Sequence, residues 1–395
     1  MRLCMISLDA VSHTDADRLL RLPALSALRE RGVFCDGVHT VYPTITYPIH
    51  ASLITGCYPE SHGIGHNQPF QPDTPKALRK WYWEHGQIQK KTLHQAAREQ
   101  GMSAASILWP VTGKSKYIQK NFPEVLPLPG ESAVVKMLQY ASPLWLLHME
   151  LLYGKQRKSI RQPDLDEYAA LLSEKLYASR RPPDLFTLHL VDCDSMRHWH
   201  GVDSPEAQSA MERLDRHVGQ VIRAIEKAGL INDTIICIVS DHGQKDAPCG
   251  VLLDTHLKAA CGARAQTLGM GAYIFGDDLK KAEETLIAHQ KEWKIARILK
   301  DQDLRALRAP RDVKLAVEAE DGCCFIDEAE ETFGEHGFSL NEPQAKTLLW
   351  LCGPGVKKGV QLKGANLVDI APTLAKLLGL SLPDAEGKVL TDALL

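Results

Sequence analysis

The sequence predicts an α/β fold, a three-layer sandwich with a central, mostly parallel sheet, helices on both faces, and an inserted cap and subdomain. Two patterns support this prediction. Apolar runs of strand length alternate with helical patterns along the 395 residues, as they do in βαβ units. Acidic and histidine residues follow several of these runs, and ligands of parallel sheets bind at the carboxyl ends of the strands.

Five apolar runs are expected to form core strands, at residues 3–8, 103–108, 185–191, 234–239 and 347–351. The clearest helix starts at Ser204, a typical N-cap residue, and stops before Gly229. Its apolar residues recur every three or four positions (211, 214, 218, 222 and 225), which gives one apolar face. A closing helix is expected over 369–378.

Two stretches fit this plan poorly and are expected to be insertions. Residues 114–182 show no obvious strand and are predicted as a cap. Residues 245–330 carry a strand–helix–strand pattern of their own (272–275, 280–289 and 313–317) and are predicted as a smaller α+β subdomain. The core is then divided into residues 1–113, 183–244 and 331–395.

Composition excludes several classes of protein. Hydrophobic residues make up 44% and charged residues 24%, as in ordinary globular chains. Because 46 basic residues face 49 acidic ones, no strong positive field is expected to attract a nucleic-acid polymer or a membrane. The most apolar stretch, 133–153, is interrupted by Lys136, Pro143 and Glu150. With ten scattered cysteines expected to be reduced, the sequence predicts a cytoplasmic protein, and it does not indicate an oligomeric state.

Six side chains near predicted strand ends are candidate metal ligands. They are Asp9, Asp194, His198, Asp241, His242 and His336. Taken singly, each is as typical of a helix cap or a surface pair. Together, three carboxylates and three imidazoles are enough to bind two divalent metal ions, and mixed nitrogen and oxygen ligands favour Zn²⁺, with Mn²⁺ or Fe²⁺ also acceptable.

A candidate nucleophile lies in the segment 42–56. Pro48 is suited to open a helix and Gly56 to close it, which places Thr46 near a helix N-terminus, where free N–H groups favour an anion. A threonine hydroxyl becomes a nucleophile when a base or metal lowers its pKa. On this segment alone, Thr46 is better explained as a helix cap.

The order of these motifs resembles the nucleotide pyrophosphatase/phosphodiesterase family of the alkaline phosphatase superfamily. After Asp9 come Pro-Thr-Ile-Thr-Tyr-Pro at 43–48 and Tyr-Pro-Glu-Ser-His-Gly-Ile at 58–64. Further along the chain are Asp-Ser-Met-Arg-His-Trp-His-Gly at 194–201, Ser-Asp-His-Gly at 240–243, and His-Gly at 336–337. With the closing helix, the resemblance extends from residue 9 to residue 379.

The resemblance implies an alkaline phosphatase-like fold and a type I phosphodiesterase/nucleotide pyrophosphatase-like hydrolase that cleaves a phosphodiester or pyrophosphate bond in a nucleotide-type small molecule. Thr46 is the implied nucleophile, which forms a covalent phospho-threonine. Asn67 and the backbone N–H of Tyr47 are the implied donors to a phosphoryl oxygen. One zinc ion is implied at Asp194, His198 and His336, and the other at Asp9, Asp241, His242 and the Thr46 oxygen.

Three residues depart from the family pattern. Arg197 stands where the family often has glycine, and Cys193 where it usually has proline. His189 occupies a position at which nucleotide-cleaving members commonly place a tyrosine that stacks on the base, whereas Tyr47 keeps the other aromatic residue of that slot. Tyr47, Asn67 and His189 are therefore the expected substrate-binding residues.

Three alternatives remain open from the sequence. A phosphonoacetate hydrolase needs a lysine for the substrate carboxylate, and Lys114, Lys116 and Lys120 are candidates. A phosphomonoesterase needs additional positive charge, for which Arg197 is the candidate. The third alternative is a non-catalytic member that binds a phosphate ligand.

Overall fold

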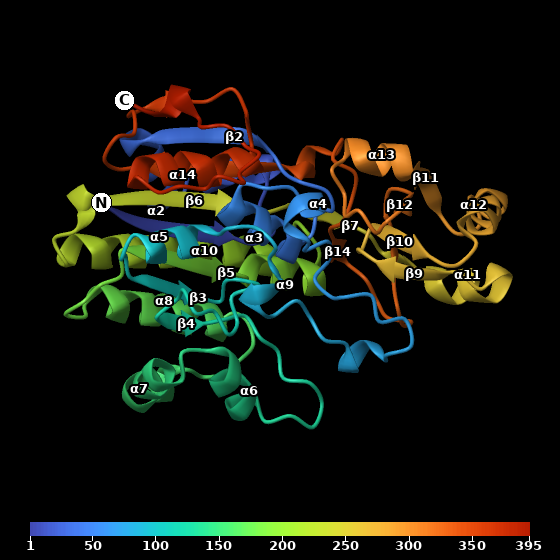
Figure 1. Ribbon diagram of the computed structural model, residues 1–395, viewed down its shortest axis with the longest axis horizontal. Helices are drawn as coiled ribbons and strands as arrows, with labels where there is room; N and C mark the ends of the chain where they lie inside the picture. The colour runs from blue at the N-terminus through green and yellow to red at the C-terminus, as the bar shows by residue number, and fades with distance from the viewer.

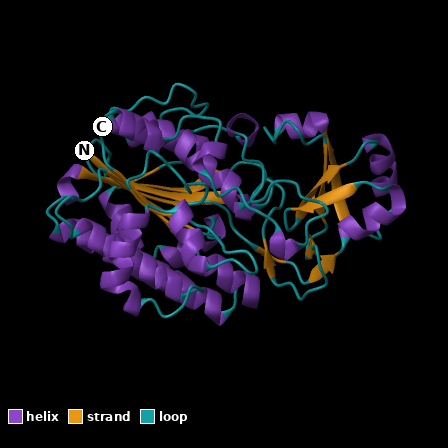
Figure 2. Ribbon diagram, turned by 60° about the horizontal axis from the view of Figure 1, so that its bottom comes forward, coloured by secondary structure: helices purple, strands orange, loops and turns teal.

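The structure is a computed structural model that describes residues 1–395. It confirms the predicted fold class, because a nine-stranded sheet lies between two layers of helices and a smaller sheet stands at one end (Figures 1 and 2). Strand β15 is antiparallel to its neighbours β2 and β6, and the other pairings in the large sheet are parallel. In the order of the sheet, the strands are β16 (Val360–Gln361), β2 (Val33–His39), β15 (Lys346–Cys352), β6 (Thr234–Ser240), β1 (Arg2–Leu8), β5 (Leu185–Leu190), β3 (Ala104–Ile107) and β4 (Lys120–Phe122), with β17 (Ala365–Asn366) also on β2.

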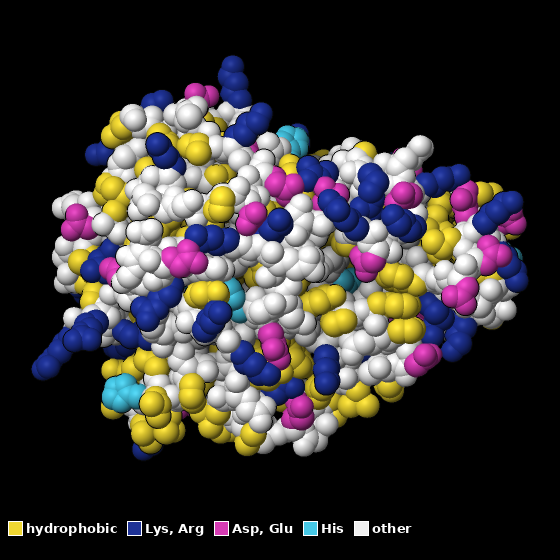
Figure 3. All heavy atoms as spheres, in the orientation of Figure 1, with side chains coloured by type: hydrophobic (Ala, Val, Ile, Leu, Met, Phe, Trp, Pro, Cys, Tyr) yellow, Lys and Arg dark blue, Asp and Glu magenta, His cyan; other side chains and the backbone are white.

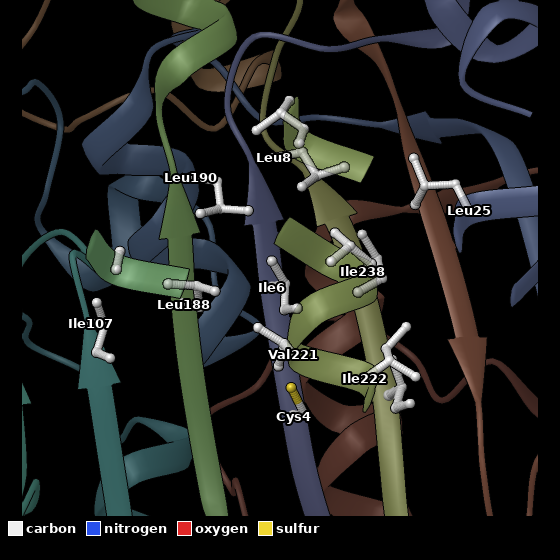
Figure 4. Close-up of a cluster of buried hydrophobic side chains, with 14 of the residues drawn as sticks. Cys4, Ile6, Leu8, Leu25, Ile107, Leu188, Leu190, Val221, Ile222 and Ile238 are labelled. Carbon is white, nitrogen blue, oxygen red and sulfur yellow. The ribbon is translucent and has the colours of Figure 1, made fainter. Parts of the chain in front are cut away.

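Strand β1 is central because both of its faces are apolar. Cys4, Ile6 and Leu8 point into one core, and Leu3 and Met5 point into the other. Figure 4 shows the first core, where side chains of β1, β5 and β6 meet those of the helical layer. A continuous apolar run is typical of a strand that is covered on both faces.

Helices cover both faces of the large sheet. One layer contains α2 (Pro23–Arg31), α8 (Asp164–Tyr177), α9 (Asp192–His200) and α10 (Pro205–Lys227). The other contains α3 (Thr46–Thr55), α5 (Leu93–Glu99) and α14 (Ile370–Leu378). Helix α10 begins as predicted, since the Ser204 hydroxyl accepts a hydrogen bond of 3.1 Å from the N–H of Ala207.

The smaller sheet is entirely antiparallel. Its order is β11 (Ile295–Lys300), β12 (Leu315–Ala319), β10 (Gly271–Phe275) and β9 (Arg264–Thr267), and it packs against α11 (Leu253–Cys261), α12 (Leu279–Ala288) and α13 (Asp301–Ala306). The predicted strand–helix–strand pattern in residues 245–330 is thus β10, α12 and β12. Two short pairs connect this region to the large sheet: β7 (Lys245–Asp246) with β14 (Gly334–Glu335), and β8 (Cys249–Val251) with β13 (Cys323–Phe325).

Residues 114–182 differ from the sequence expectation. The expected absence of a strand is wrong, because β4 pairs in parallel with β3 at the edge of the large sheet. The three residues of β4, Lys-Asn-Phe, carry too short and too polar a pattern to be recognised in the sequence. Helix α8 packs against α10, and α6 (Ala133–Tyr140) and α7 (Pro143–Tyr153) lie beside β4. Most of this stretch therefore extends the core sideways.

The remaining helices are short. They are α1 (Ala16–Leu19) and α4 (Pro59–His62), together with 3-10 turns at His13–Asp15, Lys76–Leu78, His85–Gln87, Gly154–Gln156, Ile231–Asp233, Pro343–Ala345, Leu367–Asp369 and Thr391–Ala393. The ten cysteines are free thiols. A bilayer-crossing helix would need a long apolar stretch, and none of the helices has one.

Candidate active site

The register of three adjacent strands places the candidate acids at one edge of the sheet. Leu8 at the end of β1 pairs with Leu190 of β5 and with Ser240 of β6. The next residues along these strands, Asp9 and Asp241, therefore lie side by side. Asp194 follows on α9, which begins two residues after β5.

Three groups of three ligand-type side chains form at this edge. His50, His189 and Asp241 make a group that the sequence did not predict, and the other two match the predicted ligands. Of these two, Asp194, His198 and His336 make the first group, and Asp9, Asp241 and His242 make the second. Within each group, one nitrogen or carboxylate oxygen from every residue lies within 4.8 Å of those of the other two. The first and second groups adjoin each other, since the ring centres of His242 and His336 are 4.3 Å apart.

The first group is built on one turn of helix α9. His198 Nε2 lies 3.3 Å from Asp194 Oδ1, as the i,i+4 spacing allows. The loop that carries His336 brings this imidazole against that of His198, with ring centres 5.2 Å apart. Sequence reasoning did not single out Glu335, whose Oε1 lies 3.6 Å from His198 Nδ1, although it directly precedes His336. Gln244 was missed too, and its amide donates to Asp194 Oδ1 over 2.6 Å.

The second group surrounds the Thr46 hydroxyl. His242 Nε2 lies 3.3 Å from Thr46 Oγ1, 3.3 Å from Asp241 Oδ2 and 3.7 Å from Asp9 Oδ1. Thr46 is the first residue of α3, and the N-cap position belongs to Ile45, whose side chain makes no capping bond. The helix ends at Gly56, which has a φ of 71° that favours glycine. The Thr46 hydroxyl is therefore free of a capping role and points at the ligand groups.

The electrostatics of these groups suit bound cations. Burial, with Asp241 and Asp194 nearby, raises the pKa of Asp9 well above its ordinary value. Burial also lowers the pKa of His242 to about 4 and that of His336 to about 3, so that both imidazoles are neutral at pH 7. Asp9 Oδ1, Asp241 Oδ2 and His336 Nδ1 are buried and have no hydrogen-bond partner. Asp194 and Glu335 instead raise the pKa of His198, the third imidazole. Buried carboxylates and the neutral imidazoles of His242 and His336 are ligands that divalent metal ions accept, so these residues fit two such ions.

Asn67 lies next to the candidate nucleophile. Its Oδ1 accepts a hydrogen bond of 2.9 Å from the backbone N–H of Tyr47, so the two implied phosphoryl donors contact each other. The Asn67 amide group remains available as a donor, because its oxygen is already used. Tyr47 itself is fully buried, with its ring 5.3 Å from that of Trp81. Trp81 is half-buried, and its ring lies beside the ring of Tyr47, which the sequence predicted to bind substrate.

His189 lies where it cannot contact a substrate. It is fully buried, with Nε2 3.0 Å from Asp9 Oδ2 and Nδ1 3.1 Å from Glu124 Oε2. The ring of His50 lies against it at 4.2 Å. His189 therefore has no face open to a substrate and instead orients Asp9 from behind. Glu124 enters from the segment after β4, a contact that the sequence did not indicate.

Arg197 also has a structural explanation. Its guanidinium is 1% exposed and forms a salt bridge of 2.6 Å with Asp15, and it donates to the carbonyl of Ala10. Ala10 has a φ of 59°, which is rare for a residue other than glycine, and its N–H donates to Asp241 Oδ1. Arg197 thus holds the backbone turn that follows Asp9 and carries no free charge toward a substrate.

Comparison with known proteins gives consistent matches. Residues 3–339 match the family model described as type I phosphodiesterase / nucleotide pyrophosphatase. Human ectonucleotide pyrophosphatase/phosphodiesterase family member 1 is 27% identical over 242 residues, which are 58% of this chain and 22% of that protein. The chain thus spans less than a quarter of the length of this relative. Human family member 7 is 23% identical, with 97% of this chain and 81% of the relative covered.

Solved structures show the same fold. Human ectonucleotide pyrophosphatase/phosphodiesterase 5 superposes with a TM-score of 0.74 at 21% identity, and the match covers 100% of both chains. An inactive variant of the murine protein, solved in complex with AMP, matches with the same TM-score at 20% identity.

Proposed function

Because this chain belongs to the type I phosphodiesterase / nucleotide pyrophosphatase family of the alkaline phosphatase superfamily, we propose that it hydrolyses a phosphodiester or pyrophosphate bond in a nucleotide-type small molecule. The observation that carries the proposal is the Thr46 hydroxyl, 3.3 Å from His242 Nε2 at the start of a ten-residue helix and beside two groups of metal-ligand type. The solved murine relative with AMP supports a nucleotide substrate.

Two divalent metal ions are the proposed cofactors. Asp194, His198 and His336 would hold one, and Asp9, Asp241 and His242 the other, with the Thr46 oxygen as a further ligand. The mixture of nitrogen and oxygen ligands favours Zn²⁺, and Mn²⁺ and Fe²⁺ suit the same residues. When bound, the metals would lower the pKa of the Thr46 hydroxyl and stabilise negative charge on the entering and leaving oxygens.

The chain itself would supply the nucleophile and the groups that bind the phosphoryl oxygen. Thr46 Oγ1 would attack phosphorus, so that a threonine–phosphorus bond forms as the bond to the leaving oxygen breaks. Water would then cleave the phospho-threonine and restore the hydroxyl. Because the N–H of Tyr47 donates to Asn67 Oδ1, the side-chain amide of Asn67 is the proposed donor to the phosphoryl oxygen in both steps.

Replacing Glu335 with glutamine is expected to weaken metal binding about 10- to 100-fold, because Glu335 orients the imidazole of His198 and raises its basicity. Titration of the metal-free protein with zinc checks this result. Glu331→Gln is the matched control, since Glu331 is exposed in the same segment. Equal zinc affinities of the two variants would show that Glu335 does not support His198 as a metal ligand.

Replacing Asn67 with alanine is expected to raise the barrier by about 3 kcal/mol, a loss of roughly 150-fold in turnover, if the Asn67 amide stabilises a phosphoryl oxygen in the transition state. Steady-state hydrolysis of bis-p-nitrophenyl phosphate gives this number. The exposed Asn232, replaced in the same way, is the control. An unchanged rate in Asn67→Ala would remove this residue from the site.

The alternative activities have less support. A phosphonoacetate hydrolase needs a free lysine at the site, but Lys114 pairs with Glu84, Lys120 donates to the carbonyl of Arg181, and Lys116 lies against the ring of Tyr117. A phosphomonoesterase needs a free cation, and Arg197 is bound to Asp15. A non-catalytic member has no need of a complete ligand set beside a free threonine hydroxyl.

A substrate panel separates these activities. Metal-replete protein is expected to hydrolyse bis-p-nitrophenyl phosphate and the nitrophenyl ester of thymidine monophosphate faster than p-nitrophenyl phosphate or phosphonoacetate. Faster cleavage of p-nitrophenyl phosphate would favour a phosphomonoesterase, and cleavage of phosphonoacetate alone would favour the phosphonate hydrolase. A protein without stoichiometric metal and without turnover would be a binding module.

A further inference from the structure

Helices α6 and α7 expose an unusual number of large apolar side chains. On α7, Leu144 is 85% exposed, Leu147 50% and Leu151 77%, and their spacing puts them on one face of the helix. Val134 on α6 is 68% exposed. Leu146, on the other side of α7, is 4% exposed and packs into the core. We call this exposed face the α6–α7 surface; contiguous apolar surface of this kind marks an interaction site.

Basic residues border the α6–α7 surface. Residues 131–161 contain five basic and two acidic side chains, and both acids are already paired, Glu131 with Lys136 and Glu150 with Arg157. Lys155 and Arg161 are exposed and form no ion pair. The surface therefore combines apolar side chains with positive charge that lacks a partner in the chain.

A second group of cations lies close to the end of α7. Lys175, near the end of α8, lies 5.5 Å from the ring centre of Tyr153, the last residue of α7, and is paired with Glu174. Arg180 and Arg181 lie three and four residues beyond the end of α8 and line a surface pocket together with Lys120 and with Arg2, which is paired with Asp184. Figure 3 shows hydrophobic side chains gathered at the lower left of the molecule, where Figure 1 draws α7, with Lys and Arg side chains projecting next to them.

We propose that the α6–α7 surface docks peripherally on a lipid bilayer that contains anionic headgroups. Leu144, Leu147 and Leu151 would enter the boundary between headgroups and acyl chains, while Lys155 and Arg181 face the headgroups. Trp145 and Tyr153 on the same helix are half-buried and pack against the core, so they anchor α7 to the fold. A protein partner is less favoured because the exposed basic residues beside the apolar side chains match the anionic headgroups of a membrane.

The charge pattern explains why composition did not reveal this surface. The whole chain has a net charge of −3, which predicts no attraction to anionic membranes. The local excess of basic residues around α6 and α7 is offset by acidic residues elsewhere in the chain. Because electrostatic attraction falls off within about 10 Å at 0.1 M salt, the local charge governs docking.

Flotation of the full chain with lipid vesicles tests the proposal. We expect the protein to float with vesicles of phosphatidylcholine and phosphatidylglycerol, less with phosphatidylcholine alone, and less at high salt. The double variant Leu144→Ser/Leu151→Ser is expected to lower the partition coefficient at least about tenfold. Lys155→Glu/Arg181→Glu is expected to remove the preference for phosphatidylglycerol.

The controls keep folding and catalysis separate from docking. Ile287 is 55% exposed on α12 of the smaller sheet, and Ile287→Ser is expected to leave flotation unchanged. All variants should hydrolyse soluble substrates like the wild type, because none of these residues lies in the site. A wild type that stays in solution with phosphatidylglycerol vesicles would overturn the proposal. So would Leu144→Ser/Leu151→Ser turning a dimer into a monomer with flotation unchanged, which would assign the surface to a second copy of the chain.

Discussion

Replacing Thr46 with alanine is expected to lower turnover of bis-p-nitrophenyl phosphate by about a thousandfold or more while most of the zinc remains bound. The hydroxyl is the proposed nucleophile, and water offers no equally placed substitute. Three protein ligands from Asp9, Asp241 and His242 would still hold the adjacent metal. Steady-state kinetics and elemental analysis of the same sample give both numbers.

Thr46→Ser is the matched control for this variant. Serine keeps a hydroxyl on the first turn of α3 and is expected to retain far more activity than alanine. The wild type should also yield a phosphorylated peptide containing Thr46 when the reaction is quenched in acid. Near-normal turnover in Thr46→Ala would contradict the covalent mechanism.

Removing the metals with a chelator is expected to abolish turnover and to lower the melting temperature by about 5 °C or more. A ligand present at a thousand times its dissociation constant stabilises the folded state by about 4 kcal/mol, and its loss lowers the melting temperature by several degrees. Without the metals, the buried and adjacent carboxyl groups of Asp9 and Asp241 lack the cation that would stabilise their negative charge. Calorimetry of the metal-free and zinc-loaded protein measures the difference.

The variant Asp194→Ala separates the two metal sites. It should bind one metal equivalent fewer than the wild type, and chelation should lower its melting temperature by less. Added Zn²⁺ should restore both activity and stability to the metal-free wild type. Full turnover after exhaustive removal of metal would contradict the proposed cofactors.

The strands that the sequence predicted are those buried on both faces. Strands β1, β5 and β6 are continuous apolar runs, because each lies between two layers of helices. Strand β4 has polar residues at the edge of the sheet, and β2 is interrupted by Asp36 and Gly37, so neither gave the same pattern. Local sequence thus predicts the centre of the sheet better than its edges.

The candidate site was predictable where strand ends or the family resemblance indicated a position. Asp9 and Asp241 follow adjacent strands, and their proximity needs only the register of the sheet. The surroundings were not predictable, because they depend on contacts between distant segments. Glu124 reaches His189 across 65 positions of the sequence, and Arg197 reaches Ala10 across 187. His189 lies in a predicted core strand, but its contacts with Asp9 and Glu124 had no signal in the sequence.

The ligand groups join the two ends of the chain, with Asp9 directly after the first strand and His336 in the loop before the last long one. A nascent polypeptide therefore lacks a complete site until synthesis has passed His336. A fragment that stops before His336 is therefore expected to lack one complete group of metal ligands.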